Sequence, residues 1–184
     1  MILDPAAMRG TAAGGFTSTQ GRSHTFDVRA DGYARGEAIG AIACRLYSEG
    51  CRMLGSAVRQ DGRSASLTAP NGRAQQELLA TSLTDARLAA EQVQALEAHG
   101  TGTALGDPIE AGALAAVFLV SRQSMGAFVV CSLKANAGHT EPGAGVSGAM
   151  ALLLQLRAKS MPPNAQLRRL NQRCASNPKS GRAS

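Results

Sequence analysis

Short apolar runs alternate with amphipathic segments along the chain. Four runs have the length and composition of buried β-strands: residues 38–46, 53–59, 93–97 and 127–133. Helical patterns are expected over residues 73–83, 85–91, 108–120 and 145–157, with Asn71 placed to cap the first of them. Residues 1–3 look like the end of a strand, and residues 10–25 like a loop. Strands that alternate with helices predict an α/β fold with a mostly parallel sheet covered on both faces.

A glycine-rich loop follows the apolar run at residues 93–97. It reads HGTGT at residues 99–103 and leads into GDPIE at residues 106–110. Asp107 suits the N-cap of the next helix, Pro108 its first position, and Glu110 a side chain that reaches back to the cap. In α/β proteins such a loop presents reactive side chains, and its glycines let a ligand approach the backbone.

A second loop has the same layout. It follows the run at residues 127–133, carries Lys134 and His139, and leads into the helical pattern at residues 145–157. Ligands of α/β proteins bind at the carboxyl ends of parallel strands. The two loops are therefore expected to converge on one cleft.

Residues 26–37, FDVRADGYARGE, are dense in charge yet contain two aromatic side chains. This pattern fits either a partly buried polar network or a surface turn, and the residues alone leave both open. His24, just before this block, is interpreted as a loop residue.

The composition bounds the class of protein. The chain has 184 residues, 44% of them apolar, which suffices for one domain with a real core. The net charge is +6, and no acidic residue follows Glu141. A basic end can bind acidic partners, but clustered charge is more often simply solvated. Because no aromatic residue is interleaved with these basic residues, no nucleic-acid partner is expected.

The cysteine pattern excludes some chemistry. The chain has four cysteines, at positions 44, 51, 131 and 174, in no spacing that suits zinc, and no metal site is expected. No secretory leader is recognisable, so a reducing, cytoplasmic or otherwise intracellular setting is predicted. The longest apolar run, residues 113–120, is too short to span a membrane.

Four blocks together identify a resemblance. They are FDVRADGYARGE at residues 26–37, QDGRS at residues 60–64, HGTGTALGDPIE at residues 99–110 and SLKANAGH at residues 132–139. In order and spacing they resemble the β-ketoacyl synthases (ketosynthases) of polyketide and fatty-acid synthesis. The residues within the blocks are closer to those of the modular polyketide branch. The likeness runs from about residue 1 to about residue 171.

The resemblance implies a thiolase-like fold with layered αβαβα architecture. Residues 1–52 would be the remainder of the N-terminal half, residues 53–171 most of the C-terminal half, and residues 172–184 a basic, disordered tail. The complete enzyme is expected to be a homodimer.

The implied reaction is a decarboxylative Claisen condensation. An acyl group is bound to a cysteine as a thioester. A malonyl-type extender on an acyl carrier protein loses CO2, and the resulting enolate attacks the acyl thioester. By resemblance, His99 and His139 stabilise the enolate as hydrogen-bond donors, and Lys134 holds the charge network of the site. Thr101, Thr103 and Asn136 are predicted to bind substrate, the threonines through the phosphopantetheine arm. That arm is the substrate carrier, and no tightly bound cofactor is expected.

The chain also departs from the family pattern. The family nucleophile lies in a small-residue turn before the Phe-Asp block, but no cysteine precedes Cys44. Cys131 is the only cysteine near the site, and it lacks the expected surroundings. A Gly-Phe-Gly-rich closing segment is absent too. The first hypothesis is therefore a partial ketosynthase that does not condense acyl groups by itself.

Two other hypotheses belong to different classes. One is a non-catalytic, ketosynthase-like scaffold or docking partner for carrier proteins. The other, a nucleotide or phosphate binder, predicts either Gly-x-Gly-x-x-Gly right after a strand or a Gly-Lys-Ser/Thr sequence around Lys134. Its neighbours are Leu133 and Ala135, so this last pattern fails.

Overall fold

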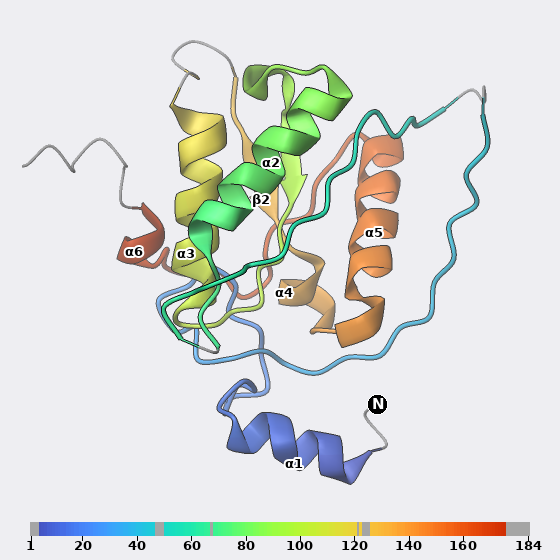
Figure 1. Ribbon diagram of the computed structural model, residues 1–184. Coiled ribbons are helices and arrows are strands. Elements are labelled where there is room, and N and C mark those ends of the chain that lie inside the picture. The colour runs from blue at the N-terminus through green and yellow to red at the C-terminus, as the bar shows by residue number, and fades with distance from the viewer. Residues whose placement is uncertain (1–3, 47–49, 67, 121, 123–125, 176–184) are drawn as a thin grey trace, which may run out of the picture.

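The computed structural model describes residues 4–46, 50–66, 68–120, 122 and 126–175. Its elements are shown in Figure 1. The helices are α1 (Pro5–Ala13), α2 (Gly72–Ala86), α3 (Gly106–Leu114), α4 (Leu133–Ala137), α5 (Ala144–Ala158) and α6 (Gln172–Ala175). The strands are β1 (Ala95–Glu97) and β2 (Val129–Cys131). Short 3-10 turns cover Ala90–Gln92 and Glu141–Gly143, and a π-helical turn, Ala115–Leu119, extends α3.

β1 and β2 form a parallel pair. Ala95 lies opposite Val129, and Glu97 lies opposite Cys131. The amide of Ala98 adds one more bond to the carbonyl of Cys131, at 2.7 Å. Both strands therefore end at the same edge, from which both predicted loops emerge. The two runs at residues 93–97 and 127–133 are confirmed as strands, although each strand is shorter than its apolar run.

Helices lie on both sides of this pair (Figure 1). α5 packs on β1, while α2 and α3 pack on each other. The side chain of Asn71 accepts the amides of Arg73 and Ala74, so the predicted cap of α2 is confirmed. α5 follows the helix expected at residues 145–157 closely.

Two predicted strands are wrong. Residues 38–46 and 53–59 have no strand assignment where the structure describes them, and they run as extended chain. In Figure 1 they follow the wide blue-to-teal arc that passes α5 and returns across α2. Gly40 approaches Val146 of α5, and the amide of Ser56 bonds Asp85 of α2 at 2.8 Å. A β-strand needs a neighbouring strand whose backbone groups can bond to its own. These two segments lie beside helices, whose side chains are available for contact but whose backbone groups are already paired.

Several helical predictions also need correction. The helix expected at residues 85–91 is absent, because Arg87 ends α2 in a left-handed conformation and a short 3-10 turn follows. α1 occupies part of the predicted loop at residues 10–25, and it starts where Asp4 accepts the amides of Ala6 and Ala7. α4 was expected to be a loop. In the basic end, Gln172–Ala175 is helical rather than disordered. The predictions for residues 1–3 and 176–184 lie outside the described residues.

The interior is apolar under the helices and polar under the loops. Ala113, Leu114 and Phe118 are buried, and the ring of Phe118 stacks on Phe128 with centroids 4.9 Å apart. Among the described residues, the largest side chains with under 2% exposure are all polar, namely Thr25, Asp27, Asp107 and Ser132. None of the helices in the described ranges has both the length and the hydrophobicity that crossing a membrane requires.

Candidate active site at the carboxyl ends of the strands

His99 and His139 lie side by side. His99 follows β1, and His139 follows α4 after β2. Their ring centroids are 5.7 Å apart with the ring planes nearly perpendicular. Tyr33 also contacts His139, with centroids 4.8 Å apart in an edge-on contact. The prediction that the two loops converge is therefore confirmed.

Two carboxylates, buried Asp107 and partly buried Glu110, shape the first loop. Glu110 accepts the amides of His99 at 2.7 Å and Gly100 at 2.8 Å. Asp107 accepts the amides of Gly102 and Thr103, and also that of Phe26 at 2.6 Å. Burial raises the pKa of both carboxyls, and these amides oppose that rise.

The expected capping arrangement is accordingly wrong. α3 begins at Gly106, one residue before the predicted cap, and neither acid caps its first turn by a side-chain bond. Both acids instead face the loop, because its amides are otherwise left without partners in the interior.

The glycines of this loop are required by crowding. Gly100 has φ +48°, and a Cβ atom there would lie 2.6 Å from Cβ of Ser132. The carbonyl of Gly100 accepts the hydroxyl of Thr25 at 2.7 Å. A larger residue would therefore force the loop away from Thr25 and from Ser132 at the start of α4.

Lys134 lies in α4, whose N-cap is Ser132. It is 7% exposed, and burial lowers its pKa, while Glu97 and Glu110 oppose the change. Glu97 also accepts the amide of Leu133 at 2.6 Å, which ties the end of β1 to the start of α4. The charge of the lysine therefore interacts with those of two acids and acts on both imidazoles.

The site keeps both imidazoles neutral near pH 7. Burial, then the charge of Lys134, then His99 lower the pKa of His139 to about 4. Burial and Lys134 also lower the pKa of His99. Nδ1 of His139 accepts the amide of Glu141 at 3.0 Å, so the neutral ring carries its proton on Nε2. His139 is therefore arranged as a hydrogen-bond donor.

The three predicted substrate-binding residues differ in their surroundings. The hydroxyls of Thr101 and Thr103 lie 3.2 Å apart in the first loop, and that of Thr103 also accepts the amide of Gly106. Asn136 lies in α4, where its amide group bonds the backbone of Pro163 and Ala165. The structure thus brings the threonines beside His99, while Asn136 holds a neighbouring loop.

The cysteines lack the surroundings of a nucleophile. The thiol of Cys131 donates its proton to Glu97 at 3.3 Å, and its Sγ also lies 3.7 Å from Oε1 of Gln155. Burial, followed by Glu97, raises the pKa of Cys131 to about 12. Burial also raises the pKa of Cys174 to about 11. Cys44 and Cys51 are exposed in the extended arc. A reactive thiol needs a lowered pKa, so Cys131 and Cys174 are unsuited to that role.

The block at residues 26–37 forms a buried polar network, as one of its two interpretations predicted. Asp27 is fully buried and accepts the guanidinium of Arg29 and the amides of Arg29, Arg168 and Arg169. Burial acts to raise the pKa of Asp27, but the Arg29 guanidinium and these amides outweigh it and hold that pKa far below its usual range. His24 is a loop residue as expected, but it is buried.

Sequence reasoning missed the pairing of Arg35 with Glu141. Nη2 of Arg35 lies 3.1 Å from the Glu141 carboxylate, across 106 positions of sequence. The acidic residue next to a loop histidine was the available signal, but its distant partner was not visible in the spacing.

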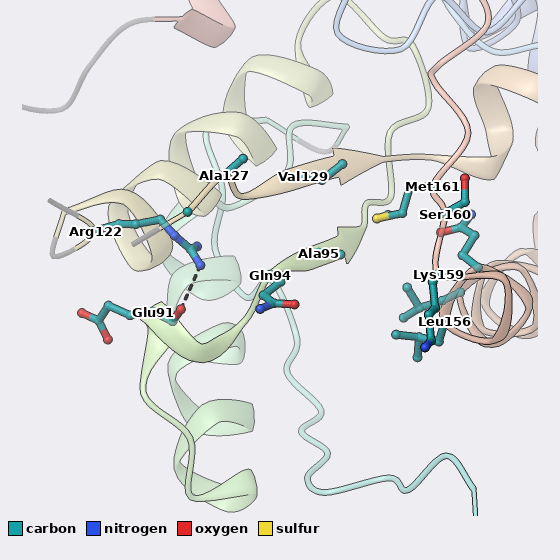
Figure 2. Close-up of a pocket in the computed structure, with 13 residues that line it drawn as sticks. Glu91, Gln94, Ala95, Arg122, Ala127, Val129, Leu156, Lys159, Ser160 and Met161 are labelled. Atoms are coloured by element: carbon teal, nitrogen blue, oxygen red, sulfur yellow. Dashed lines mark hydrogen bonds between the residues drawn. The ribbon is translucent and has the colours of Figure 1, made fainter. Parts of the chain in front are cut away.

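A cavity of about 710 Å³ lies at the other end of the strands (Figure 2). Gln94, Ala95 and Val129 line it where the strands begin, and Leu156 and Lys159 line it from the end of α5. Arg122, beside it, donates to the carbonyls of Glu91 and Val93. The histidines are not among its lining residues, so this cavity is separate from the candidate site.

Comparison with protein families agrees with the site geometry. The family described as "Beta-ketoacyl synthase, C-terminal domain" matches residues 51–168, and "Beta-ketoacyl synthase, N-terminal domain" matches residues 1–48. The chain belongs to the β-ketoacyl synthase family. The resemblance carried by the four sequence blocks is confirmed, and His99, Lys134 and His139 all lie in the region matched by the C-terminal domain.

Curated relatives of this ketosynthase chain are polyketide synthases. It is 40% identical over 179 residues to a phenolphthiocerol/phthiocerol polyketide synthase of Mycobacterium tuberculosis, covering 93% of this chain and 10% of that protein. It is also 40% identical to the highly reducing polyketide synthase alnA of Emericella nidulans, over 94% of this chain and 7% of that protein. The chain thus spans a tenth or less of these two relatives.

Solved ketosynthases share the fold. A ketosynthase from module 6 of the bacillaene synthase of Bacillus subtilis 168 superposes with a TM-score of 0.82 at 30% identity. An oxazolomycin ketosynthase domain of Streptomyces albus JA3453 gives 0.76 at 29% identity. The matches cover 93% of this chain and 32% and 31% of those two chains. The ketosynthase chain therefore has the thiolase-like fold expected from the resemblance, over about a third of a ketosynthase.

Proposed function

We propose that this chain is the histidine-bearing part of a β-ketoacyl-[acyl carrier protein] synthase that acts in polyketide or fatty-acid biosynthesis. The observation that carries the proposal is the pair of imidazoles, His99 and His139, with ring centroids 5.7 Å apart at the end of the strands from which buried Lys134 also follows. The partners of the proposed reaction are an acyl carrier protein and its acyl and malonyl thioesters, in a cytoplasmic setting. The complete enzyme would be a homodimer.

The chemistry explains why neutral histidines are needed. Decarboxylation breaks the bond between the malonyl carboxylate and its α-carbon, and the electron pair moves into a thioester enolate. Nε2–H of His139 donates to the enolate oxygen, and His99, which also stays neutral, adds a second donor. A donor fixed in advance stabilises such charge without reorganisation, and losing one typically costs about 2.7–4 kcal/mol of barrier. The enolate carbon then attacks the carbonyl carbon of the acyl thioester, and the new carbon–carbon bond forms as the carbon–sulfur bond to the cysteine breaks and releases its thiolate.

The remaining predicted residues have supporting roles in this proposal. Lys134 maintains the charge balance between Glu97 and Glu110, which face it from β1 and α3. Thr101 and Thr103 offer hydroxyls to the phosphopantetheine arm beside His99. Asn136 acts on substrate indirectly, because its polar atoms bond the backbone at residues 163–165. The acyl-bearing cysteine comes from ketosynthase sequence outside these 184 residues, so condensation needs that additional part.

Decarboxylation without condensation tests the proposal. The purified chain is incubated with a malonyl thioester, and formation of the acetyl thioester is followed by mass spectrometry. We expect slow turnover that His99→Ala or His139→Ala reduces by about 10²–10³-fold. Glu77→Gln, an exposed change in α2, serves as the control that leaves the rate unchanged. Turnover that both histidine variants retain would disprove the assigned roles.

The cysteine environment favours a second candidate function. Because the pKa values of Cys131 and Cys174 are raised, a non-catalytic scaffold or docking partner for carrier proteins also fits the chain. This alternative predicts that holo-acyl carrier protein binds with equal affinity to the parent chain and to His99→Ala, while no acetyl thioester forms. Calorimetric titration combined with the decarboxylation assay separates the two functions.

A further inference from the structure

The backbone of Glu141 has an unusual conformation beside the site. Its φ is +51°, a left-handed value that residues with a side chain rarely adopt. Pro142 follows, and a residue before proline favours extended angles. Yet this conformation directs the Glu141 amide to Nδ1 of His139, 3.0 Å away. Something else in the structure must therefore hold Glu141 in place.

The side chain of Glu141 stabilises this backbone conformation. Its Oε2 lies 3.1 Å from Nη2 of Arg35, and the two side chains are only 15% and 9% exposed. Its Oε1 accepts the hydroxyl of Tyr33 at 3.4 Å. A charged pair this well shielded from water is stronger than an exposed one. The carboxylate thus fixes the residue whose backbone is strained.

The segment that carries Arg35 also brackets His139 itself. The amide of His139 donates to the carbonyl of Ala34 at 2.7 Å, and the amide of Gly36 donates to the carbonyl of His139 at 2.8 Å. The ring of Tyr33 contacts the imidazole edge-on. Residues 33–36 therefore control both the backbone and the hydrogen-bond partner of this histidine.

We propose that the Arg35–Glu141 ion pair is a positioning device that holds the Glu141 amide on Nδ1 of His139. The proton of the neutral ring is thereby kept on Nε2, the nitrogen that faces the reacting thioester if the proposed function holds. Arg35, Tyr33 and Glu141 do not touch the substrate in this scheme. They act through the orientation and tautomer of His139.

A matched pair of substitutions at position 141 tests the mechanism directly. Both Glu141→Ala and Glu141→Gly remove the carboxylate, but only glycine adopts φ +51° without strain. The hydrogen bond is read by NMR on the ¹⁵N-labelled chain, as the coupling between the amide nitrogen of residue 141 and Nδ1 of His139. We expect the coupling in the parent chain and in Glu141→Gly, and its loss in Glu141→Ala and Arg35→Met.

Two further variants keep the test informative. Tyr33→Phe leaves the ion pair intact and should keep the coupling. Arg73→Met removes an exposed ion pair of the same kind in α2, with Glu77, and should change nothing at His139. The imidazole signals of His99 report whether each variant is folded. If Arg35→Met is unfolded, the comparison of Glu141→Ala with Glu141→Gly still decides the question.

The outcomes separate this inference from the proposed function. A coupling that persists in folded Glu141→Ala and Arg35→Met shows that the ion pair does not position the amide, and the inference fails. Equal loss in Glu141→Ala and Glu141→Gly would show that the carboxylate positions the amide whatever the backbone strain, and would overturn only the role assigned to the left-handed conformation. None of these measurements needs turnover. If the decarboxylation assay fails while the NMR results hold, the proposed function falls and the positioning device remains.

Discussion

Two regions of the chain contrast sharply. The polar loops around the histidines are densely bonded, as Asp27, Asp107 and Glu110 each accept two or more backbone amides, and Asp27 and Asp107 are almost fully buried. The extended arc, residues 36–46 and 50–59, is richer in large apolar side chains, yet Leu46 and Val58 are 85% and 87% exposed. Burial here follows the availability of partners rather than hydrophobicity alone.

The contrast has a physical basis. Each buried carboxylate satisfies several amides at once, so the loops keep one arrangement despite their polar content. The arc lies near α5 and α2, whose backbone groups are already paired within the helices. Extended chain without a neighbouring strand gains few hydrogen bonds and little burial. Four substitutions or conditions test this difference, beginning with the polar loops.

The largest effect is expected for Asp27→Asn. The amide side chain keeps the shape but loses the charge that pairs with Arg29 and accepts the amides of Arg168 and Arg169. Breaking a buried charged pair typically costs about 3–5 kcal/mol, and urea denaturation of the folded chain should show a loss near that range. Asp61→Asn, at an exposed position in the described chain, is the control. Equal stability of the two variants would contradict the network described for Asp27.

Acid should destabilise the chain through His139. Its pKa is about 4 in the folded state against an ordinary value of 6.5, so the unfolded chain binds its proton more readily. The stability that this residue contributes is complete above pH 6.5 and is lost as the pH falls toward 4, by at most roughly 3 kcal/mol. The measurement is urea denaturation between about pH 4 and 7 on the parent chain and His139→Asn. Since buried carboxyls titrate in the same window, only the difference between the two curves reports His139, and identical curves would refute the shift.

A smaller effect is expected at the start of α2. Asn71→Ala removes the cap of the amides of Arg73 and Ala74, which is worth about 1 kcal/mol. It also removes bonds from the same side chain to the carbonyls of Asp61 and Arg63. Asn71→Asp keeps the cap but loses these two donors. Thermal unfolding should therefore rank the parent chain first, Asn71→Asp second and Asn71→Ala third, and a reversed order would count against the cap.

The smallest effect is expected in the arc. Ile39→Ser and Val58→Ser alter exposed side chains and should shift the free energy of unfolding by no more than about 0.5 kcal/mol. Phe118→Ala, in the core beside Phe128, should cost about 3–5 kcal/mol by comparison. Urea denaturation of the three variants measures the difference. A large loss of unfolding free energy in either serine variant would mean that the arc is buried in solution. It would contradict the difference in burial between the arc and the polar loops.

Much of the site was visible in the sequence because it depends on local order. The runs before His99 and Lys134 are strands, the glycines permit a crowded loop, and Asn71 caps α2 as its position suggested. These features depend on residues within a few positions of one another. The segments that were predicted wrongly depend on partners that are far away in the sequence. Residues 38–46 and 53–59 have strand composition, but composition supplies no neighbouring strand, and Asp107 and Glu110 bond the loop rather than cap their helix.

Motifs and local patterns establish the family, the alternation of strands and helices around the site, and the pair of histidines that the loops bring together. Only the tertiary structure decided how the site is held. Arg35 reaches Glu141 across most of the chain, the Glu141 amide selects the protonated nitrogen of His139, and Lys134 is buried where the charges of Glu97 and Glu110 act on it. The reason is physical, since propensity and periodicity act between near neighbours, whereas pKa values, tautomers and buried ion pairs depend on groups that the fold brings together.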